Sequence, residues 1–503
     1  MNIFQNKLKP QHQSMINATI VFLAAAFVFS QYGFNGTLRR DDAVFLYSGQ
    51  QLLKGIPPYI SIFQPKTPLW AFFAGLGAAI AQLFNFSDIL AVRGVFFVVS
   101  CLTVVAIYFL GGALFQSRKV GFLAAFIFIG FWGFGRHAAS GPRAKSVMVL
   151  FECLALLFTT RKKWFWAGIS GSLAFLTWQP TLIYPILTIF LAFTQSEHQE
   201  RKRHLAHAIA GIFIPLALIV AYLLYTSAFK YFIDDAFLFP ILDLEHLALS
   251  LSERLLLPVD VIFLRSAYSS HALAIFLGLS MLIALFVWRI KVHGGLLAFL
   301  SSDTFAAFLL SFLAPVIWSV LDFQGYPDFF VFLPYFAISF AWMVFLTLEG
   351  LRQTKGVGNR VPVAAFCIIC ALLLFSAARE YRLTAEDGLL DQLQWAQEIE
   401  TNYLTEDNDR LLSLGRPEIL VLLHRTNANR HIVINSGEHK IIEALTLGGL
   451  DGWLSEQIGD DSPVVVLGEV SPRDTKAEIR KWLESHGFEK KAVGSWVIYT
   501  QIP

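Results

Sequence analysis

Two carboxylates and two guanidiniums stand next to one another directly after the first apolar run of the chain. They belong to Arg39, Arg40, Asp41 and Asp42. Charges close to a low-dielectric boundary cost free energy unless they are paired. A cluster of this kind can hold one carboxylate as a general base while its cations bind an anion. The structural alternative is that Asp41 caps the helix that follows and that the arginines anchor this helix at an interface.

The rest of the chain has the composition of a membrane protein. Of its 503 residues, 55% are hydrophobic and only 15% are charged, against roughly 25% charged residues in an ordinary soluble domain. The mean hydropathy is +0.57. A soluble globule cannot bury that much apolar surface, whereas a helix of about 20 apolar residues satisfies its own backbone in hydrocarbon. The composition therefore predicts a polytopic α-helical membrane protein and excludes a soluble globular one.

Eleven apolar stretches are expected to cross the membrane. They are residues 15–34, 92–114, 120–135, 146–159, 164–178, 180–194, 205–225, 271–288, 304–322, 328–348 and 361–378. A further apolar stretch, residues 69–84, would rise only about 24 Å as a helix, against a hydrocarbon core of about 30 Å. We interpret it as a helix in the outer interface, although counting it as a span would reverse every later loop.

Basic residues in short loops decide between these two topologies. If residues 69–84 do not cross, the short basic segments all share one side of the membrane, as the positive-inside rule expects. These segments begin at Lys7, Arg118, Arg161, Arg201, Arg289 and Arg352. The N-terminus is then cytoplasmic, and the outer loop 35–91, with its amphipathic interfacial helices, lies outside together with the tail. The predicted location is the plasma (cell inner) membrane, with multiple passes.

Residues 379–503 are expected to form a small extracytoplasmic α/β domain after a transmembrane domain of residues 1–378. Acidic residues outnumber basic ones in this tail, whereas basic residues are in excess before it. Strands are predicted for RLLSLG, HIVINS, PVVVLGE and, as a closing pair, FEKKAVGSWVIYTQ; helices are predicted for LLDQLQWAQEIETNYL, GLDGWLSEQI and TKAEIRKWLESH. The tail has no G-x-G-x-x-G nucleotide fingerprint, and no nucleic-acid partner is expected.

The first outer loop carries an ordered set of residues that resembles the C-type membrane glycosyltransferases. The order is a pair of acids, aromatic residues, a Pro-Tyr turn and then Lys-x-Pro-Leu. The matching residues are Asp41, Asp42, Phe45, Tyr47, Leu52, Leu53, Gly55, Pro58, Tyr59, Lys66, Pro68 and Leu69. This family includes the protein O-mannosyltransferases and the lipid A aminoarabinose transferases. Looser matches continue through SGPRAKSVMVLFECLALLF, AGISGSLAFLTWQPTLI and FQGYPDFFVFLPYFAIS to the tail.

Three positions depart from the pattern of the family. Lys145 stands where many relatives have an acidic residue, and Trp178 stands where a lysine is common. Ser61 stands where an aspartate often follows the Pro-Tyr turn. Two of these departures remove carboxylates that could hold a divalent metal. We therefore expect no cofactor. A divalent metal stays open as an alternative, although the sequence does not support one.

The resemblance implies transfer of a sugar from a polyprenyl-phosphate carrier to a lipid, glycan or protein acceptor outside the membrane. The reaction needs a base, cations for the leaving phosphate and a groove for the lipid. The base is assigned to Asp41, with Asp42 as its orienting partner or alternate. The phosphate candidates are basic residues of the outer side: Arg39, Arg40, Lys66, Arg136, Arg143 and Lys145. The alternative for each of them is snorkelling at the interface.

Other side chains are candidates for contacts with sugar, lipid or acceptor. They are Tyr59, Trp70, Trp178, Gln324, Tyr326 and Asp328, although aromatic residues also form interface belts. Glu152 is the clearest ionisable residue inside a span, and it either has a function or pairs with an outer-loop cation. Two other functions stay open. A transporter or flippase would favour several charges within spans and a repeated half, and a non-catalytic scaffold would not need Asp41.

Overall fold

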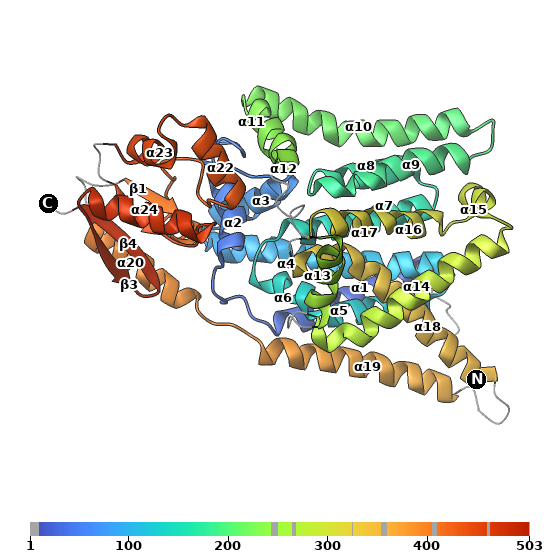
Figure 1. The fold of residues 1–503 in the computed structure, drawn as a ribbon. Helices are drawn as coiled ribbons and strands as arrows, with labels where there is room; N and C mark the ends of the chain where they lie inside the picture. The colour runs from blue at the N-terminus through green and yellow to red at the C-terminus, as the bar shows by residue number, and fades with distance from the viewer. Residues whose placement is uncertain are drawn as a thin grey trace.

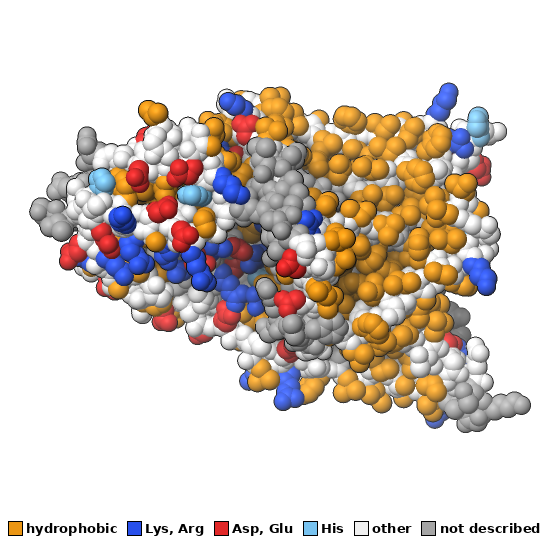
Figure 2. Space-filling view, viewed as in Figure 1, with side chains coloured by type: hydrophobic (Ala, Val, Ile, Leu, Met, Phe, Trp, Pro, Cys, Tyr) orange, Lys and Arg blue, Asp and Glu red, His pale blue; other side chains and the backbone are white. Residues whose placement is uncertain are grey.

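Long apolar helices run side by side through most of the molecule (Figure 1). The computed structural model describes residues 10–242, 250–263, 268–323, 325–353, 360–404, 410–459 and 463–501. Within these residues, six helical segments are long and apolar enough to cross a membrane. They lie in α1 (Pro10–Ser30), α4 (Asp88–Phe115), α10 (Arg201–Tyr225), α14 (Ala272–Val292), η5 with α18 (Tyr326–Phe332 and Leu333–Gln353) and α19 (Arg360–Leu383). Hydrophobic side chains cover the flank of this part (Figure 2), so the chain is a multi-pass membrane protein.

Two bent pairs raise the number of spans in the described residues to as many as eight. In the first, α5 (Arg118–Gly130) meets α6 (Trp132–Ser140) at 73°. In the second, α15 (Leu296–Ser302) is followed at 117° by α16 and α17 (Ala306–Ser311 and Leu313–Leu321). The predicted spans between residues 146 and 194 fall on shorter helices: α7 (Ala144–Thr160), α8 (Trp164–Phe175), η1 (Gln179–Leu182) and α9 (Ile183–Thr194). The total of eleven spans stays a prediction.

The short apolar helix α3 (Leu69–Phe84) packs between α2 (Arg40–Leu53) and α4. Small residues allow the close approach on both sides. A Cβ atom on Gly49 would lie 2.6 Å from the backbone of Ala74, and one on Gly77 would lie 2.6 Å from the Cα of Val92. Helix α3 therefore holds α2 against the end of α4. Its place in the outer interface stays a prediction.

Short helices connect the later spans at the end of the helical part that faces the C-terminal layer. They are α11 (Phe229–Ile233), the π-helical turn η2 (Asp234–Leu238), α12 (Phe239–Leu242), α13 (Leu251–Phe263) and η4 (Ser269–His271). Figure 1 shows α11, α12 and α13 at the end of the spans that faces the C-terminal layer.

The C-terminal layer is a mixed four-stranded sheet with helices. Its strands are β1 (Leu411–Leu414), β2 (Val464–Leu467), β3 (Phe488–Val493) and β4 (Trp496–Gln501), in the order β1-β2-β4-β3. Strands β1 and β2 are parallel, and the other two pairings are antiparallel. The helices are α20 (Leu389–Tyr403), α21 (Pro417–Leu422), α22 (Ser436–Leu445), α23 (Gly449–Ile458) and α24 (Arg473–Ser485).

One predicted strand is wrong. The segment HIVINS, residues 431–436, forms no strand. The Ile432 carbonyl accepts a single bond from the Gly415 amide at 2.6 Å, and the Ile434 carbonyl accepts one from the Ser471 amide at 3.0 Å. The Asn435 carbonyl accepts from the His439 amide at the start of the helix that follows. The apolar residues alternate because Ile432 and Ile434 are buried in the core. An extended connection can bury alternate side chains in this way without pairing to another strand.

Helix α2 is clamped between the membrane helices and the C-terminal layer. The amide side chain of Gln392 accepts from the Leu38 N–H at 2.7 Å and donates to the Leu38 carbonyl at 3.0 Å. Farther along, the Gln50 side chain donates to the Val421 carbonyl at 3.0 Å, and the Tyr47 hydroxyl accepts from the Asn427 amide at 3.1 Å. The clamp fixes both the start and the middle of α2.

A second contact ties the C-terminal layer to the loop between α2 and α3. The Arg430 guanidinium pairs with Asp235 and donates to the Tyr59 carbonyl at 2.8 Å. The Asp235 carboxylate also accepts from the Gln64 amide at 3.3 Å. The loop that leads from α2 to α3 is thereby held from the side opposite the membrane helices.

Candidate functional site

The first turn of α2 places two carboxylates at different depths. The Asp41 side chain is 49% exposed, whereas the Asp42 side chain is 1% exposed. Arg39 occupies the N-cap position, and no side chain caps the helix. The structural alternative in which Asp41 is the cap is therefore wrong. Both carboxylates still face the positive end of the helix dipole.

Arg143 connects the two carboxylates. Its Nη1 atom donates to the Asp41 Oδ2 at 2.7 Å, and its Nε atom lies 3.3 Å from the Asp42 Oδ1. The second contact has an ion-pair distance without hydrogen-bond geometry, and neither Asp42 oxygen has a hydrogen-bond partner among the described residues. A Cβ atom on Gly141 would lie 2.8 Å from the Asp42 Cγ, so a glycine at this position lets the loop carrying Arg143 come close to α2.

The two carboxylates have pKa values on opposite sides of the ordinary value. For Asp41, burial raises the pKa, but attraction to Arg143, Lys66 and Arg40 outweighs it and lowers the pKa from 3.8 to about 2. For Asp42, burial raises the pKa to about 6, against the opposing attraction of Arg143. Asp41 is therefore fully ionised near neutral pH, and Asp42 titrates a little below it.

Ionisation of the buried Asp42 is expected to lower the free energy of unfolding as the pH rises from about 4 to 6. The folded protein then retains a proton that the unfolded chain has released, so ionisation favours unfolding. Since each pKa unit corresponds to about 1.4 kcal/mol, this contribution is about 3 kcal/mol. Thermal unfolding in detergent should show a drop over this window that is smaller in an Asp42→Asn protein.

Comparing the wild-type protein with the Asp42→Asn protein isolates the contribution of Asp42, because both proteins contain the other buried acids. Burial raises the pKa of Asp235 to about 6 and that of Glu418 to about 7. An Asp391→Asn protein, which changes an exposed aspartate in the first turn of α20, should keep the wild-type drop. An equal drop in the Asp42→Asn protein would contradict the raised pKa of Asp42.

Three other cations stand around Asp41. Arg40 Nε lies 3.7 Å from the Asp41 Oδ1. Lys66 acts electrostatically on Asp41, and its ammonium lies 5.3 Å from the centre of the Phe45 ring. Burial lowers the pKa of Lys66, an effect that attraction to Asp41 opposes. Lys145 lies in the same field, close enough to interact with Lys66 and Arg143. The cluster can neutralise an anion that approaches Asp41 from the exposed side.

Comparison with known proteins places this site in a familiar fold. Residues 65–225 match the family model described as dolichyl-phosphate-mannose-protein mannosyltransferase. The crystal structure of apo ArnT from Cupriavidus metallidurans superposes with a TM-score of 0.59 at 11% identity, over 98% of this chain and 99% of that one. The chain has the C-type membrane glycosyltransferase fold. The resemblance predicted from the first outer loop is confirmed.

Two further structures share this C-type fold. ArnT from Cupriavidus metallidurans bound to undecaprenyl phosphate gives a TM-score of 0.56 at 12% identity, over 98% of this chain and 99% of that one. The Archaeoglobus fulgidus oligosaccharyltransferase tethered to an acceptor peptide gives 0.54 at 12% identity, over 91% of this chain and 69% of that one. These relatives are glycosyltransferases. No curated protein sequence matches the chain.

Two of the predicted phosphate-binding residues have other partners in this C-type fold. Arg39 pairs with Glu386, at the connection from α19 to α20. Arg136, on α6, donates to the Tyr326 hydroxyl and lies over the ring of Trp132 at 4.6 Å. Both side chains therefore link separate segments around the site, and Arg39 also acts electrostatically on Asp42.

Lys145 and Asp328 form an ion pair beside the cluster of α2. Both side chains are buried, and the Lys145 ammonium also lies 4.7 Å from the centre of the Trp178 ring. Asp322 acts electrostatically on both Lys66 and Lys145. Sequence reasoning missed Asp322, although it stands two residues before the predicted contact Gln324, which itself lies outside the described residues.

Three of the four predicted aromatic contacts interact with protein groups in the structure, and their roles toward a ligand stay a prediction. Tyr59 is buried and its hydroxyl donates to the Lys66 carbonyl at 2.6 Å. Trp70 is buried against Phe45, with ring centres 4.7 Å apart. The Tyr326 hydroxyl is shared by Arg136 and His137. Trp178 lies under Lys145, and Tyr326 also acts electrostatically on Arg143.

Glu152 lies among hydroxyl groups inside the helical part. It interacts with Tyr184 and Tyr335, whose hydroxyls are 3.0 Å apart, and Ser311 lies 2.7 Å from the Tyr335 hydroxyl. No ion pair with an outer-loop cation is found for Glu152 among the described residues. In the same residues, no group of three or more His, Cys, Asp or Glu side chains could hold a metal ion.

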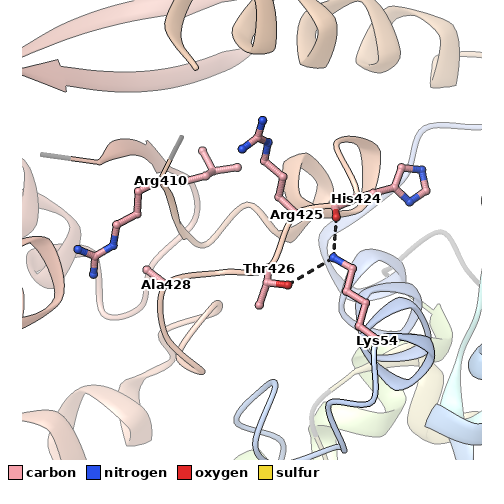
Figure 3. A pocket seen from close by; sticks show the side chains of 7 residues that line it. Lys54, Arg410, His424, Arg425, Thr426 and Ala428 are labelled. Atoms are coloured by element: carbon pink, nitrogen blue, oxygen red, sulfur yellow. Dashed lines mark hydrogen bonds between the residues drawn. The ribbon is translucent and has the colours of Figure 1, made fainter. Parts of the chain in front are cut away.

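A basic cavity lies at the other end of α2 (Figure 3). It has a volume of about 260 Å³, and it is lined by Lys54, Arg410, Leu411, His424, Arg425, Thr426 and Ala428. The Lys54 ammonium donates to the His424 carbonyl at 2.6 Å and contacts the Thr426 hydroxyl at 3.3 Å. Because α2 has 14 residues, about 20 Å of helix separates the cavity from Asp41. The two sites are distinct.

Proposed function

We propose that the chain transfers a sugar from a polyprenyl-phosphate-linked donor to an acceptor hydroxyl on the extracytoplasmic side of the membrane. The observation that carries the proposal is the half-exposed Asp41 carboxylate, held 2.7 Å from Arg143 with Lys66 and Arg40 around it. The site lies where the apolar helices meet the polar C-terminal layer (Figure 1). A donor with a lipid tail and a charged headgroup needs such a boundary.

Each charged residue has a role in this reaction. Asp41 takes the proton from the acceptor hydroxyl as its oxygen attacks the sugar. The phosphate then leaves with one more negative charge than it had in the donor. Arg143 and Lys66 stabilise that charge, which develops in the transition state. Asp42 holds Arg143 in place, because a buried carboxylate 3.3 Å from Nε restricts the guanidinium.

Donor binding is also expected to raise the pKa of Asp41. A carboxylate with a pKa near 2 is a poor base in the empty site. The cations that lower this pKa are the ones that would contact the donor phosphate. A bound phosphate neutralises their field, while burial of Asp41 remains and raises its pKa. Asp41 therefore becomes a stronger base when the donor is present, which couples proton removal to donor binding.

The orientation is also part of the proposal. We assign the end of the helices that bears α15 to the cytoplasm and the C-terminal layer to the extracytoplasmic side. Basic residues of the short loops lie at the α15 end: Lys119 is paired with Glu349, and Arg289 is paired with Asp303. This grouping supports the positive-inside assignment. The same assignment puts the N-terminus in the cytoplasm. The plasma (cell inner) membrane is proposed as the location.

A transfer assay tests the proposal directly. The purified full chain is incubated with polyprenyl-phosphate donors that carry different hexoses or pentoses, and with lipid, glycan and peptide acceptors. We expect release of polyprenyl phosphate that depends on one donor sugar and on an acceptor. Parallel reactions with a chelator test whether a metal is required. Failure of every donor to react, with a protein that is folded by its thermal unfolding, would contradict the proposal.

A further inference from the structure

A band of cationic side chains extends from the site across the C-terminal layer. We call Arg40, Arg416, Lys476, Arg480 and Lys490 the basic band. Figure 2 shows Lys and Arg side chains gathered along one edge of this layer, up to the boundary with the helical part. The band is unexpected because acidic residues outnumber basic ones in the tail. Its residues come from four separate segments: α2, the start of α21, α24 and β3.

Contacts between neighbours make the band continuous. Arg40 lies 3.7 Å from Asp41 at one side and 3.2 Å from Glu469 at the other. Glu469 and Arg416 both act electrostatically on Lys476, and Lys476 and Arg480 stand one helical turn apart on α24. Lys490 is paired in register with Tyr499, which interacts with Arg480. The basic band therefore leads from Asp41 to the far strand of the sheet.

The acids near the basic band do not neutralise it. Against the five cations stand Glu469, whose side chain is 71% exposed, and Glu418, which is buried. Glu484 acts electrostatically on Tyr499 at the Arg480 end, so among the described residues three acids oppose five cations. Burial raises the pKa of Glu418 to about 7, so about half of its charge is absent near neutral pH. Burial, together with repulsion from Arg416, Arg480 and Lys490, lowers the pKa of Lys476. Such repulsion favours binding of an external anion.

The direction of the basic band distinguishes between two kinds of anion. Figure 1 shows α24 at the end of the molecule away from the spans, at a distance from the membrane helices. A plane of lipid headgroups would reach the Arg40 end only. An extended molecule with negative groups along its length could contact the whole band. The geometry therefore favours a polyanionic chain.

We propose that the basic band binds an acceptor that carries repeated phosphate or carboxylate groups and guides one of its hydroxyls to Asp41. This inference rests on the proposed function and specifies its acceptor class. The sugar would then be added to a polyanionic glycan or similar polymer, with the band acting as a binding surface and not as part of the catalytic cluster.

Binding of inorganic polyphosphate to the detergent-solubilised full chain tests the band without any turnover. The test variant is Arg480→Gln/Lys490→Gln. The control, Lys440→Gln/Lys481→Gln, removes the same charge at exposed positions outside the band. We expect the test variant to bind polyphosphate roughly tenfold or more weakly than wild type at low salt, and the control to stay within about twofold. Wild-type binding should weaken in 1 M salt, where the Debye length is about 3 Å.

Equal weakening in both variants would overturn the inference, because net charge alone would then account for binding. So would a wild-type protein that ignores polyphosphate but binds vesicles of anionic lipid, since the band would then be a membrane contact. The binding result does not depend on sugar transfer. If polyphosphate binding depends on the basic band but no acceptor receives sugar, the result counts against the proposed function alone. If sugar is transferred but polyphosphate binding does not depend on the basic band, the result counts against this inference alone.

Discussion

An Asp41→Asn protein is expected to transfer sugar roughly 10²–10⁴-fold more slowly than wild type. The amide cannot accept the proton of the acceptor hydroxyl. Its loss of negative charge leaves Arg143 and Lys66 more available to the donor phosphate, so the affinity for the donor should rise. Single-turnover transfer and donor binding, measured on the same preparation, separate the two effects.

An Asp391→Asn protein is the matched control, because Asp391 is also an exposed aspartate in the first turn of a helix. It should transfer at the wild-type rate. Wild-type transfer by the Asp41→Asn protein would remove Asp41 from the role of base. If an Asp42→Asn protein were then inactive while still folded, the role would pass to Asp42, whose pKa of about 6 makes it the stronger base in the empty site.

Replacement of Arg143 by methionine should affect both stability and activity. It leaves two carboxylates without their shared cation, and one of them is fully buried. Removal of one partner of a buried ion pair typically costs about 3–5 kcal/mol. We expect a lower temperature of thermal unfolding in detergent and no detectable transfer, because the leaving phosphate also loses its main cation.

A double variant separates the two roles of Arg143. In Arg143→Met/Asp42→Asn, the buried negative charge is gone, so much of the stability should return, whereas transfer should not. Arg425→Met is the control, since Arg425 forms an ion pair at the surface with Glu400 at 3.5 Å and such pairs contribute little. Recovery of transfer in the double variant would show that Arg143 acts through Asp42 and not on the donor.

The charged cluster could be predicted in part because its members lie in short motifs of the outer loops. Asp41, Asp42, Lys66 and Arg143 were each candidates from residue type and order. Their mutual contacts were not predictable, because Asp41 and Arg143 are 102 residues apart. The loop before α7 brings them together, since Gly141 lets it approach Asp42 closely. The opposite pKa shifts of Asp41 and Asp42 depend on depth of burial, which adjacent residues in a sequence do not reveal.

Partners that come from distant segments explain the remaining differences. Arg39 and Arg40 are adjacent arginines, yet Arg39 pairs with Glu386, which is 347 residues away in the sequence. Tyr59 and Trp70 are aromatic side chains of a kind that can contact a ligand, but tertiary packing buries both of them. The segment 431–436 alternates like a strand, but no neighbouring strand is placed to pair with it. In each case a partner from a distant segment, which the local residue pattern does not reveal, decided where the side chain lies.

The clamp on α2 has a consequence for how the protein is made. Leu38 and Gln392 are 354 residues apart, so the helix that bears Asp41 leaves the ribosome long before the residue that fixes its start. At about 5–20 residues per second, the delay is on the order of tens of seconds. A nascent chain therefore carries these carboxylates without the finished arrangement around them until Gln392 has been made.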